Sequence, residues 1–472
     1  MSTAIVWFRR DLRLEDHPAL SAACRAHDRV LLIYIHAPHE DGPWAAGGAS
    51  RWWLHHSLSR LDAQLRERHH ALHLRQGDSL AVLLDIIARS GATAVYWNRL
   101  YEPTAIARDR VIKAALRDRG IEAHSFNAAL WCEPWQIETR QQGPYRVFTP
   151  FWRALRPQLE GPRPLPAPAH LPGLELAGGL PLDALSLLPS IHWDAGLKQA
   201  WQPGEQGAQE MLDIFLDDAV GGYAQARDLP ARHGTSRLSP HLHFGEISPR
   251  QIQRQLIDRA TATDARRRPD IEPFLRELGW REFAHHLLYH FPQTPTANFN
   301  EQFDRFPWTR QCAKAIASWQ RGRTGIPLVD AGMRELWHTG WMHNRVRMIV
   351  ASFLTKNMGQ HWHHGARWFW DTLVDADLAN NTLGWQWVAG SGADAAPYFR
   401  VFNPVTQAQK FDAEGQYLRR WLPELAGAPL PLLHEPWKDP SLLRRSGYPS
   451  PIIDLGQSRE DALAAYRGMR NG

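Results

Sequence analysis

Ten of the 22 tryptophans in this sequence lie between Trp280 and Trp387, where Arg, Asn, His and Asp residues are interleaved with them. An indole ring offers a flat face for packing or for stacking on a base, an N–H donor, and a π-system that can be oxidised and pass on an electron. The polar neighbours leave three roles open for this stretch: packed core, a platform for nucleic-acid bases, or an electron path.

A second segment with chemical potential runs from Thr235 to Ser239. It offers three hydroxyl groups and one guanidinium within five residues and stands just before a predicted helix. A diphosphate is bound by such short donors, by backbone N–H groups and by a cation. An ordinary Ser/Thr helix cap has the same composition, so the segment alone leaves both interpretations open.

Glu277, Trp280 and Arg281 fall at positions i, i+3 and i+4 of a predicted helix and therefore share one face. That face can present a carboxylate, an aromatic ring and a cation to one ligand. A solvated face with a half-buried tryptophan is the alternative interpretation.

Three polar side chains, Asn344, Arg345 and Arg347, interrupt another predicted helix that is otherwise apolar. An amide and two guanidiniums there need acidic partners or ligand oxygens, because burying an unpaired charge is expensive. Asp375 and Asp377 are the predicted partners.

The sequence does not predict a metal site. The segment that begins at Asp375 matches a calcium loop at two positions only and lacks its sixth-position Gly and twelfth-position acid. The chain has 24 histidines and three cysteines, but no His-Glu-x-x-His helix and no Cys-x-x-Cys pair. Nucleophile elbows and Walker loops are also missing from the sequence.

The elements that must position these residues begin with alternating β and α patterns. Short, β-rich apolar runs predict strands at residues 4–8, 30–36, 71–75, 94–98 and 121–126. Helical patterns alternate with them at residues 19–27, 51–69, 80–90 and 104–119. Repeated β-α units predict a doubly wound parallel sheet, which binds ligands beyond the carboxyl ends of its strands. A pocket is therefore expected at residues 7–13, 36–40 and 97–102.

A segment rich in Pro, Gly and Leu at residues 157–189 suits neither a long helix nor a central strand. Beyond Trp201 strand-like runs vanish, and helical patterns continue to about residue 356 and again over residues 366–383. The predicted organisation is an α/β domain at residues 1–130, a linker at residues 131–200 and an all-α domain at residues 201–472.

Composition sets wider limits on function. A formal net charge of +5 permits a polyanionic partner without demanding one. The N-terminus lacks the apolar stretch of a signal peptide, and no apolar run is long enough to span a bilayer. We expect a cytoplasmic protein with no membrane contact, and nothing in the sequence suggests more than a monomer.

Several motifs in a fixed order resemble the photolyase/cryptochrome family of flavoproteins. They are Thr-Ser-Arg-Leu-Ser at 235–239, Trp-Arg-Glu-Phe at 280–283, Trp-Met-His-Asn-Arg at 341–345, Asp-x-Asp-Leu-Ala at 375–379 and Trp-Gln-Trp at 385–387. The resemblance runs from about residue 4 to residue 424. It implies an α/β domain joined by a long linker to an all-α domain that holds FAD.

The resemblance assigns the FAD contacts residue by residue. It places the FAD phosphates and polar edges against Tyr223, Thr235, Ser236, Arg237, Leu238, Ser239, Phe274, Asn344, Arg347, Asp375, Ala376, Asp377 and Asn381. Asn381 would face the flavin N5, and Arg347 would pair with Asp375. Phe274 stands where the family often has a tryptophan near the adenine.

Within the family the motifs resemble the photolyases that split cyclobutane pyrimidine dimers in UV-damaged DNA. The implied DNA and lesion contacts are Arg227, Glu277, Trp280, Arg281, Asn344, Arg345, Met348, Trp387, Arg400 and Gln407. Excited reduced FAD would give an electron to the flipped-out dimer, and Glu277 would hydrogen-bond the lesion. A cryptochrome-like photoreceptor without repair activity is the alternative function.

The resemblance also divides the tryptophan-rich stretch. Trp385, Trp362 and Trp308 would form the path that reduces the flavin, with Trp308 requiring a one-residue alignment gap. Trp319, Trp337, Trp341, Trp368 and Trp370 are left as packed core. A second, light-harvesting chromophore, either a folate or a deazaflavin, is expected in the N-terminal domain near Arg9, Asp11, Arg51 and Glu102.

Overall fold

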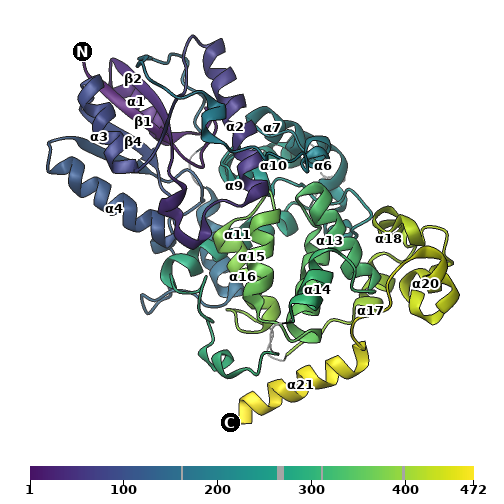
Figure 1. The fold of residues 1–472 in the computed structure, drawn as a ribbon. Coiled ribbons are helices and arrows are strands. Elements are labelled where there is room, and N and C mark those ends of the chain that lie inside the picture. The colour runs from purple at the N-terminus through teal and green to yellow at the C-terminus, as the bar shows by residue number, and fades with distance from the viewer. Residues whose placement is uncertain (161–162, 263–269, 310–311, 396–398, 472) are drawn as a thin grey trace. The chain divides into compact units, whose positions relative to one another are not determined.

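The computed structural model describes residues 1–160, 163–262, 270–309, 312–395 and 399–471 (Figure 1). The chain divides into two compact units. Unit 1 comprises Met1–Asp194, Trp201–Gly221 and Ser236–Pro292, and unit 2 comprises Ala195–Ala200, Gly222–Thr235 and Gln293–Gly472. The domain limits predicted at residues 130 and 200 stay a prediction.

Unit 1 contains a five-stranded parallel sheet in the order β3-β2-β1-β4-β5. Its strands are β1 (Thr3–Phe8), β2 (Arg29–His36), β3 (His73–Gln76), β4 (Ala94–Asn98) and β5 (Glu122–Phe126). Every residue of the central strand β1 is buried, as expected when helices cover both faces of a parallel sheet. The predicted strands and the doubly wound sheet are confirmed, although β3 begins at His73 instead of at residue 71.

The first four helices of unit 1 alternate with the strands, and its other helices follow β5 along the chain. In chain order the helices are α1 (Pro18–Ala26), α2 (Gly48–Glu67), α3 (Ser79–Ser90), α4 (Pro103–Arg117), α5 (Phe148–Leu155), α7 (Glu205–Ile214), α9 (Ser239–His243), α10 (Pro249–Ala262) and α11 (Glu272–His290). Helices α3 and α4 pack on the sheet face that carries Ile5, Trp7 and Val95, whereas α1 contacts β1 and β4. Proline at the first position of α1 and α4 provides a φ suited to helix entry.

Unit 2 is helical. It contains α6 (Ala195–Ala200), α8 (Tyr223–Ala226), α12 (Ala313–Gln320), α13 (Pro327–Thr339), α14 (Asn344–Ser352), the π-helical turn η8 (Phe353–Asn357), α15 (Trp362–Thr372), α16 (Leu378–Ala389), α17 (Pro404–Phe411), α18 (Gln416–Trp421), α19 (Leu430–His434), α20 (Pro440–Ser446) and α21 (Leu455–Asn471). Helices α13 to α16 lie side by side around one apolar core (Figure 1). In the described part of the chain, no strand follows β5.

The helical stretch predicted at residues 366–383 is two helices instead of one. Helix α15 ends at Thr372, and α16 begins at Leu378. The side chain of Asp377 accepts a hydrogen bond from the backbone N–H of Asn380 and so caps the start of α16. The break matters because it carries two of the predicted site residues, Asp375 and Asp377.

The tryptophans predicted to be packed core differ in burial. Trp319 is fully buried, and Trp341, Trp368 and Trp370 are half-buried. Trp337 is 58% exposed, so its assignment to the core is wrong. Its ring stacks on that of Trp368 with centroids 6.0 Å apart, which covers one face and leaves much of the indole in solvent.

None of the helices within the described ranges combines the length and apolarity needed to cross a bilayer.

Candidate functional site

The two guanidiniums of α14 each have an acidic partner, Asp228 for Arg345 and Asp375 for Arg347. A guanidinium nitrogen of Arg347 lies 2.8 Å from a carboxylate oxygen of Asp375, as predicted. The Nε of Arg347 also donates to the carbonyl of Met342, at 2.7 Å. Asp375 is almost fully buried while Arg347 is partly exposed, so the pair is anchored in the core of unit 2 and reaches toward its surface.

One face of α16 offers polar groups beside open space. Asp377 caps the helix, and Asn381 lies one turn later, where its side-chain amide donates to the carbonyl of Ala366 at 3.1 Å. Gly384 follows Asn381 by three positions, and a Cβ built on it would meet nothing within 4 Å. This face can therefore accept a flat ligand with a polar edge, and it fits the flavin expected there.

The three tryptophans of unit 2 predicted to form an electron path are linked through two other residues, Gly365 and His361. Trp385 and Trp362 are buried, whereas Trp308 is half-exposed. Trp385 packs on α15 at Gly365, where an added Cβ would lie 1.9 Å from the indole, and Gly365 is one turn after Trp362. The ring of His361 lies 5.6 Å from that of Trp362 and 5.0 Å from that of Trp308.

The indole of Trp362 is held in place by polar contact. Its N–H donates to the side-chain oxygen of Asn298 at 2.9 Å. Burial lowers the pKa of the neighbouring His363 to about 4, so this imidazole is neutral at physiological pH. Indole rings can be oxidised and pass on an electron, and the role of these three tryptophans as an electron path stays a prediction.

Helix α11 of unit 1 carries the predicted lesion residues. Trp280 is half-buried, and its ring stacks on Phe148 of α5 with centroids 3.8 Å apart and planes 10° from parallel. Glu277, one turn earlier, is also half-buried. Stacking on Phe148 fixes the plane of the indole, which is what a platform for another flat ring requires.

Arg281 and Glu282 connect α11 to the segment after β5. Arg281 donates to the carbonyl of Ala129 at 2.7 Å, so its predicted contact with DNA stays a prediction. Glu282 accepts hydrogen bonds from the backbone N–H groups of Trp131 and Cys132. Burial raises the pKa of Glu282 to about 7, against the opposing effect of Arg281 and these donors.

The predicted diphosphate segment contains a residue with a left-handed backbone conformation. Arg237 adopts a positive φ of 53°, and its guanidinium lies over the ring of Trp201, 4.3 Å from the centroid. Helix α9 begins at Ser239, so the predicted helix start is confirmed. Ser239 is exposed, Thr235, Ser236 and Arg237 are half-buried, and Leu238 is buried.

The remaining predicted FAD contacts lie on several elements. Tyr223 is buried at the start of α8, in unit 2, and the guanidinium of Arg227 lies 5.5 Å from its ring centroid. Phe274 is buried on α11, in unit 1, and its ring lies 4.5 Å from that of Phe215. Ala376 is buried in the turn between α15 and α16.

The remaining predicted DNA contacts gather in unit 2. Arg345 pairs with Asp228 at 2.7 Å, and one of its nitrogens lies 3.9 Å from the sulfur of Met348. Trp387 is half-buried and donates to the carbonyl of Asp394 at 3.0 Å. Asn344 and Arg400 are exposed, and Gln407 is half-buried. These predicted roles in DNA binding stay predictions.

The carboxyl edge of the sheet differs from expectation. Arg9 pairs with Asp109 at 2.8 Å and Asp11 pairs with His17 at 3.0 Å, all of them buried, so Arg9 and Asp11 serve internal contacts. Arg10 pairs with Glu102, and Arg51 is exposed and donates to the carbonyl of Ala46. The edge is therefore largely filled by ion pairs.

A cavity of about 370 Å³ lies beside α4 in unit 1. Its lining includes aromatic rings and cations, among them Tyr101, Trp135, Tyr289, Arg99 and Lys113. It adjoins part of the predicted pocket at residues 97–102.

One group of potential metal ligands lies in unit 1, at His39, Glu40 and Asp78, and its first two members belong to the predicted pocket segment at residues 36–40. Glu40 already accepts from the backbone N–H and the hydroxyl of Ser79, each at 2.6 Å, and from Arg108. The prediction of no metal stays a prediction.

Phe148 and Gly365 contact predicted site residues although the sequence interpretation did not single them out, and His361, which was considered only as a possible metal ligand, lies beside Trp362 and Trp308. Phe148 is 132 residues from Trp280, and no periodicity links the two. His361 precedes Trp362 directly and Gly365 follows it by one helical turn. This spacing could have indicated that both lie next to the Trp362 side chain.

The chain matches two models of protein families. Residues 4–169 match the model described as DNA photolyase, and residues 274–468 match the model described as FAD binding domain of DNA photolyase. The chain is 46% identical to the deoxyribodipyrimidine photo-lyase of Agrobacterium fabrum over 99% of its own length and 98% of the relative's. It is 40% identical to cryptochrome-2 of Arabidopsis thaliana, over 97% of this chain and 77% of that protein.

Among solved structures, the class III photolyase of Agrobacterium tumefaciens is similar with a TM-score of 0.95 and 46% identity, covering 100% of this chain and 98% of that chain. The fold class and the presence of an FAD-binding domain agree with the sequence prediction. Family models cover both the sheet-containing and the helical regions, and relatives match over almost the whole length. The chain therefore belongs to the photolyase/cryptochrome family.

Proposed function

We propose that this protein is a DNA photolyase that splits cyclobutane pyrimidine dimers in UV-damaged DNA under blue light. Bound, reduced FAD supplies the light-driven donation of one electron to the dimer and its recovery after the ring has opened. The observation that carries the proposal is the Trp280 platform: an indole fixed in plane by Phe148, part-exposed, with the Glu277 carboxylate one turn away on α11.

Stacking explains how a damaged pair is selected. A crosslinked pyrimidine pair stacks poorly in the duplex, so extruding it costs less than the few kcal/mol typical of a normal base. Trp280 and Trp387 each recover roughly 1–3 kcal/mol by stacking on an extruded ring. Glu277 accepts a hydrogen bond from the lesion, while Arg227, Arg345, Arg400 and Gln407 hold the flanking backbone.

The residues assigned to FAD hold its phosphates and the polar edge of the flavin. Tyr223 and residues 235–239 hold the phosphates, and Asp375, Asp377 and Asn381 meet the polar edge of the flavin. The ion pair between Arg347 and Asp375 keeps the Asp375 carboxylate in place, so the charge beside the ligand is fixed before the ligand arrives. Trp385, Trp362 and Trp308 carry electrons inward to reduce the flavin.

For the second chromophore, the cavity beside α4 is our candidate site. Trp135 and Tyr289 offer aromatic walls, and Arg99 and Lys113 offer cations for an acidic group. A folate and a deazaflavin both combine a flat ring with a negatively charged tail, so both suit this chemistry.

A blue-light photoreceptor is the second candidate function, because similarity to cryptochrome-2 spans nearly the whole chain. The two functions differ in one measurable step. A receptor absorbs light and changes its flavin state, whereas a photolyase also restores pyrimidines.

The deciding experiment gives purified, FAD-loaded and reduced protein an oligonucleotide with one thymine dimer under blue light. Recovery of the pyrimidine absorbance band is the expected result, and samples kept in the dark or given undamaged DNA are the controls. Bound FAD without light-dependent recovery would remove the photolyase function and leave the receptor.

A further inference from the structure

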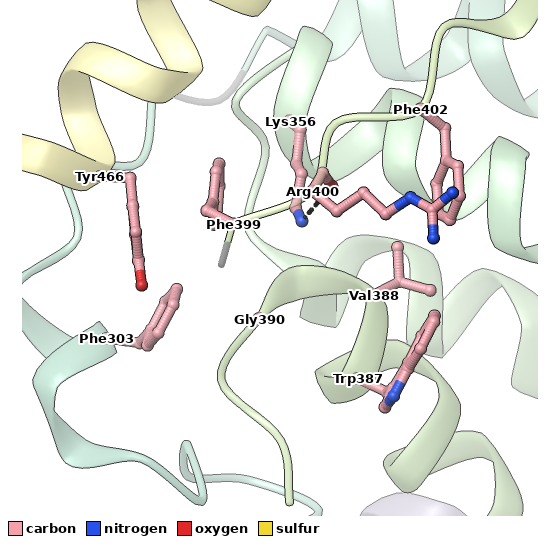
Figure 2. A pocket seen from close by; sticks show the side chains of 9 residues that line it. All are labelled: Phe303, Lys356, Trp387, Val388, Gly390, Phe399, Arg400, Phe402 and Tyr466. Atoms are coloured by element: carbon pink, nitrogen blue, oxygen red, sulfur yellow. Dashed lines mark hydrogen bonds between the residues drawn. The ribbon is translucent and has the colours of Figure 1, made fainter. Parts of the chain in front are cut away.

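A buried lysine lies in a small cavity of unit 2, next to the predicted DNA contacts (Figure 2). Lys356, on η8, is 6% exposed, and its side chain lines the cavity together with Trp387 of α16 and Arg400. Trp387 and Arg400 are lesion and backbone contacts in the function proposed above. Lys356 has no part in that function so far.

The ammonium of Lys356 is held without an acid. It donates to the backbone carbonyl of Arg400 at 2.7 Å and lies 4.0 Å from the ring centroid of Phe399. Figure 2 shows Phe399 between Lys356 and Tyr466, and the Tyr466 ring stacks on Phe399 with centroids 4.6 Å apart. Among the described residues, the structure gives Lys356 no carboxylate partner, and none lines this cavity.

A buried ammonium without a carboxylate partner is a potential binding site for an anion. Removing a cation from water is costly unless a negative charge or several acceptors replace the solvent, and one carbonyl and one ring replace it only in part. The cost is visible in the free protein, where burial lowers the pKa of Lys356 to about 7. The ammonium of Lys356 is the buried cation of this cavity, whereas Arg400 is exposed and its guanidinium lies 4.9 Å from the ring centroid of Phe402 (Figure 2).

The size and position of the cavity narrow the anion to one class. Its volume is about 50 Å³. A single water needs about 10–15 Å³, so the four oxygens of one phosphate group fit. The cavity wall includes Trp387, on which a base is proposed to stack, and a stacked base brings its own backbone phosphates within reach.

We infer that the cavity formed by Lys356, Arg400 and Trp387 is a binding site for one backbone phosphate of the DNA strand that carries the lesion. The inference rests on the proposed function. The ammonium of Lys356, which donates to the carbonyl of Arg400, supplies the positive charge, and one phosphodiester oxygen takes the place of a counter-ion beside it. Trp387 then stacks a base whose phosphate is already fixed.

The test replaces one phosphodiester at a time by a neutral methylphosphonate in oligonucleotides that contain a dimer. The FAD-loaded wild type is expected to lose about 10-fold in affinity at one linkage. Lys356→Met should bind the natural oligonucleotide about 10-fold more weakly than the wild type does, and the methylphosphonate at that linkage should not lower its affinity further. At every other linkage the methylphosphonate should change the affinity of both proteins equally. The slope of log affinity against log salt should be smaller by about one in Lys356→Met.

Two further variants make the result specific. Lys356→Arg keeps the positive charge, so its affinity should still fall when the methylphosphonate stands at the sensitive linkage. This variant keeps the test possible if Lys356→Met loads FAD poorly. Lys314→Met removes an exposed lysine of α12 and is expected to behave as wild type. A folded Lys356→Met protein whose affinity still falls about 10-fold when the methylphosphonate stands at that linkage, as in the wild type, would overturn the inference.

Other outcomes separate this inference from the proposed function. A wild type that neither prefers dimer-containing DNA nor repairs it contradicts the function itself. A wild type that repairs, with linkage sensitivity independent of Lys356, contradicts only the phosphate site. Inorganic phosphate is the second probe: if it stabilises wild type but not Lys356→Met against heat, and no linkage is sensitive, the cavity binds a free anion instead of the strand.

Discussion

At the scale of single residues, function in this protein depends on side chains whose orientation is set by a neighbour. Phe148 fixes the ring plane of Trp280, and Asp375 holds the guanidinium of Arg347. A stacking ring that is already oriented loses less entropy on binding than a mobile one, so more of the contact energy becomes affinity.

Replacing Trp280 by Ala should therefore weaken binding to damaged DNA much more than binding to undamaged duplex. Loss of roughly 1–3 kcal/mol of stacking corresponds to roughly a 5- to 150-fold rise in Kd. Fluorescence anisotropy with dimer-containing and undamaged oligonucleotides measures both affinities. Trp337→Ala removes an exposed indole from α13 and is the matched control, expected to change neither. Equal losses on both DNAs in Trp280→Ala would contradict the stacking role.

At the scale of elements, the sheet was predictable and the packing around it was not. The strands of a parallel sheet are buried on both faces, so they appear in the sequence as continuous apolar runs, of which β1 and β4 are examples. The pair of Arg347 with Asp375 was also predicted, because the residues left Asp375 and Asp377 as partners and the family resemblance selected Asp375. Burial of Lys356 was not, because its neighbours come from Phe399 and Tyr466, far along the chain.

The exposure of Trp337 was misjudged for a related reason. Composition predicts that a tryptophan is usually packed, but which face of α13 meets other helices is decided by long-range contacts. The amphipathic pattern alone did not reveal that Trp337 lies on the outer side.

Helix α11 should give the fold a pH dependence through Glu282. With its folded pKa raised to about 7, Glu282 binds more protons in the folded state than in the unfolded chain from about pH 4.5 to 7. Its contribution to the free energy of unfolding is therefore present at low pH and is lost as the pH rises through 7. Glu282→Gln cannot titrate, so its stability relative to wild type should increase over this window, by a change on the order of 3 kcal/mol.

Urea unfolding at pH 5 and at pH 8 measures this change. Glu210→Gln, which alters an exposed residue of α7, provides the comparison and should run parallel to wild type at both pH values. A difference between Glu282→Gln and wild type that stays constant with pH would show that Glu282 is ionised throughout.

At the scale of the whole molecule, the tryptophan-rich region has separate tasks. Trp280 and Trp387 serve the lesion in the proposed function, and the proposed row of Trp385, Trp362 and Trp308 runs from two buried indoles to a half-exposed one. Reduction of the flavin and repair of DNA are thus assigned to different residues, and the two processes can be separated by mutation.

Trp385→Phe should slow light-driven flavin reduction by external donors at least 10-fold, because phenylalanine is much harder to oxidise than tryptophan. Repair by protein reduced beforehand should be unchanged. Flavin absorbance during illumination follows the first process, and dimer loss follows the second. Trp319→Phe is the control, since Trp319 is equally buried and lies 6.3 Å from the Trp385 ring but outside the row. Equal slowing in both variants would contradict the row as the path.

The position of Trp385 depends on the absence of a Cβ atom at Gly365. Trp385 occupies the space where residue 365 would otherwise place its Cβ. For protein engineering, this makes position 365 a means of adjusting the distance between donor and acceptor rings: one added carbon would displace the indole of Trp385, and the rate of an electron step would change although no aromatic residue had been replaced.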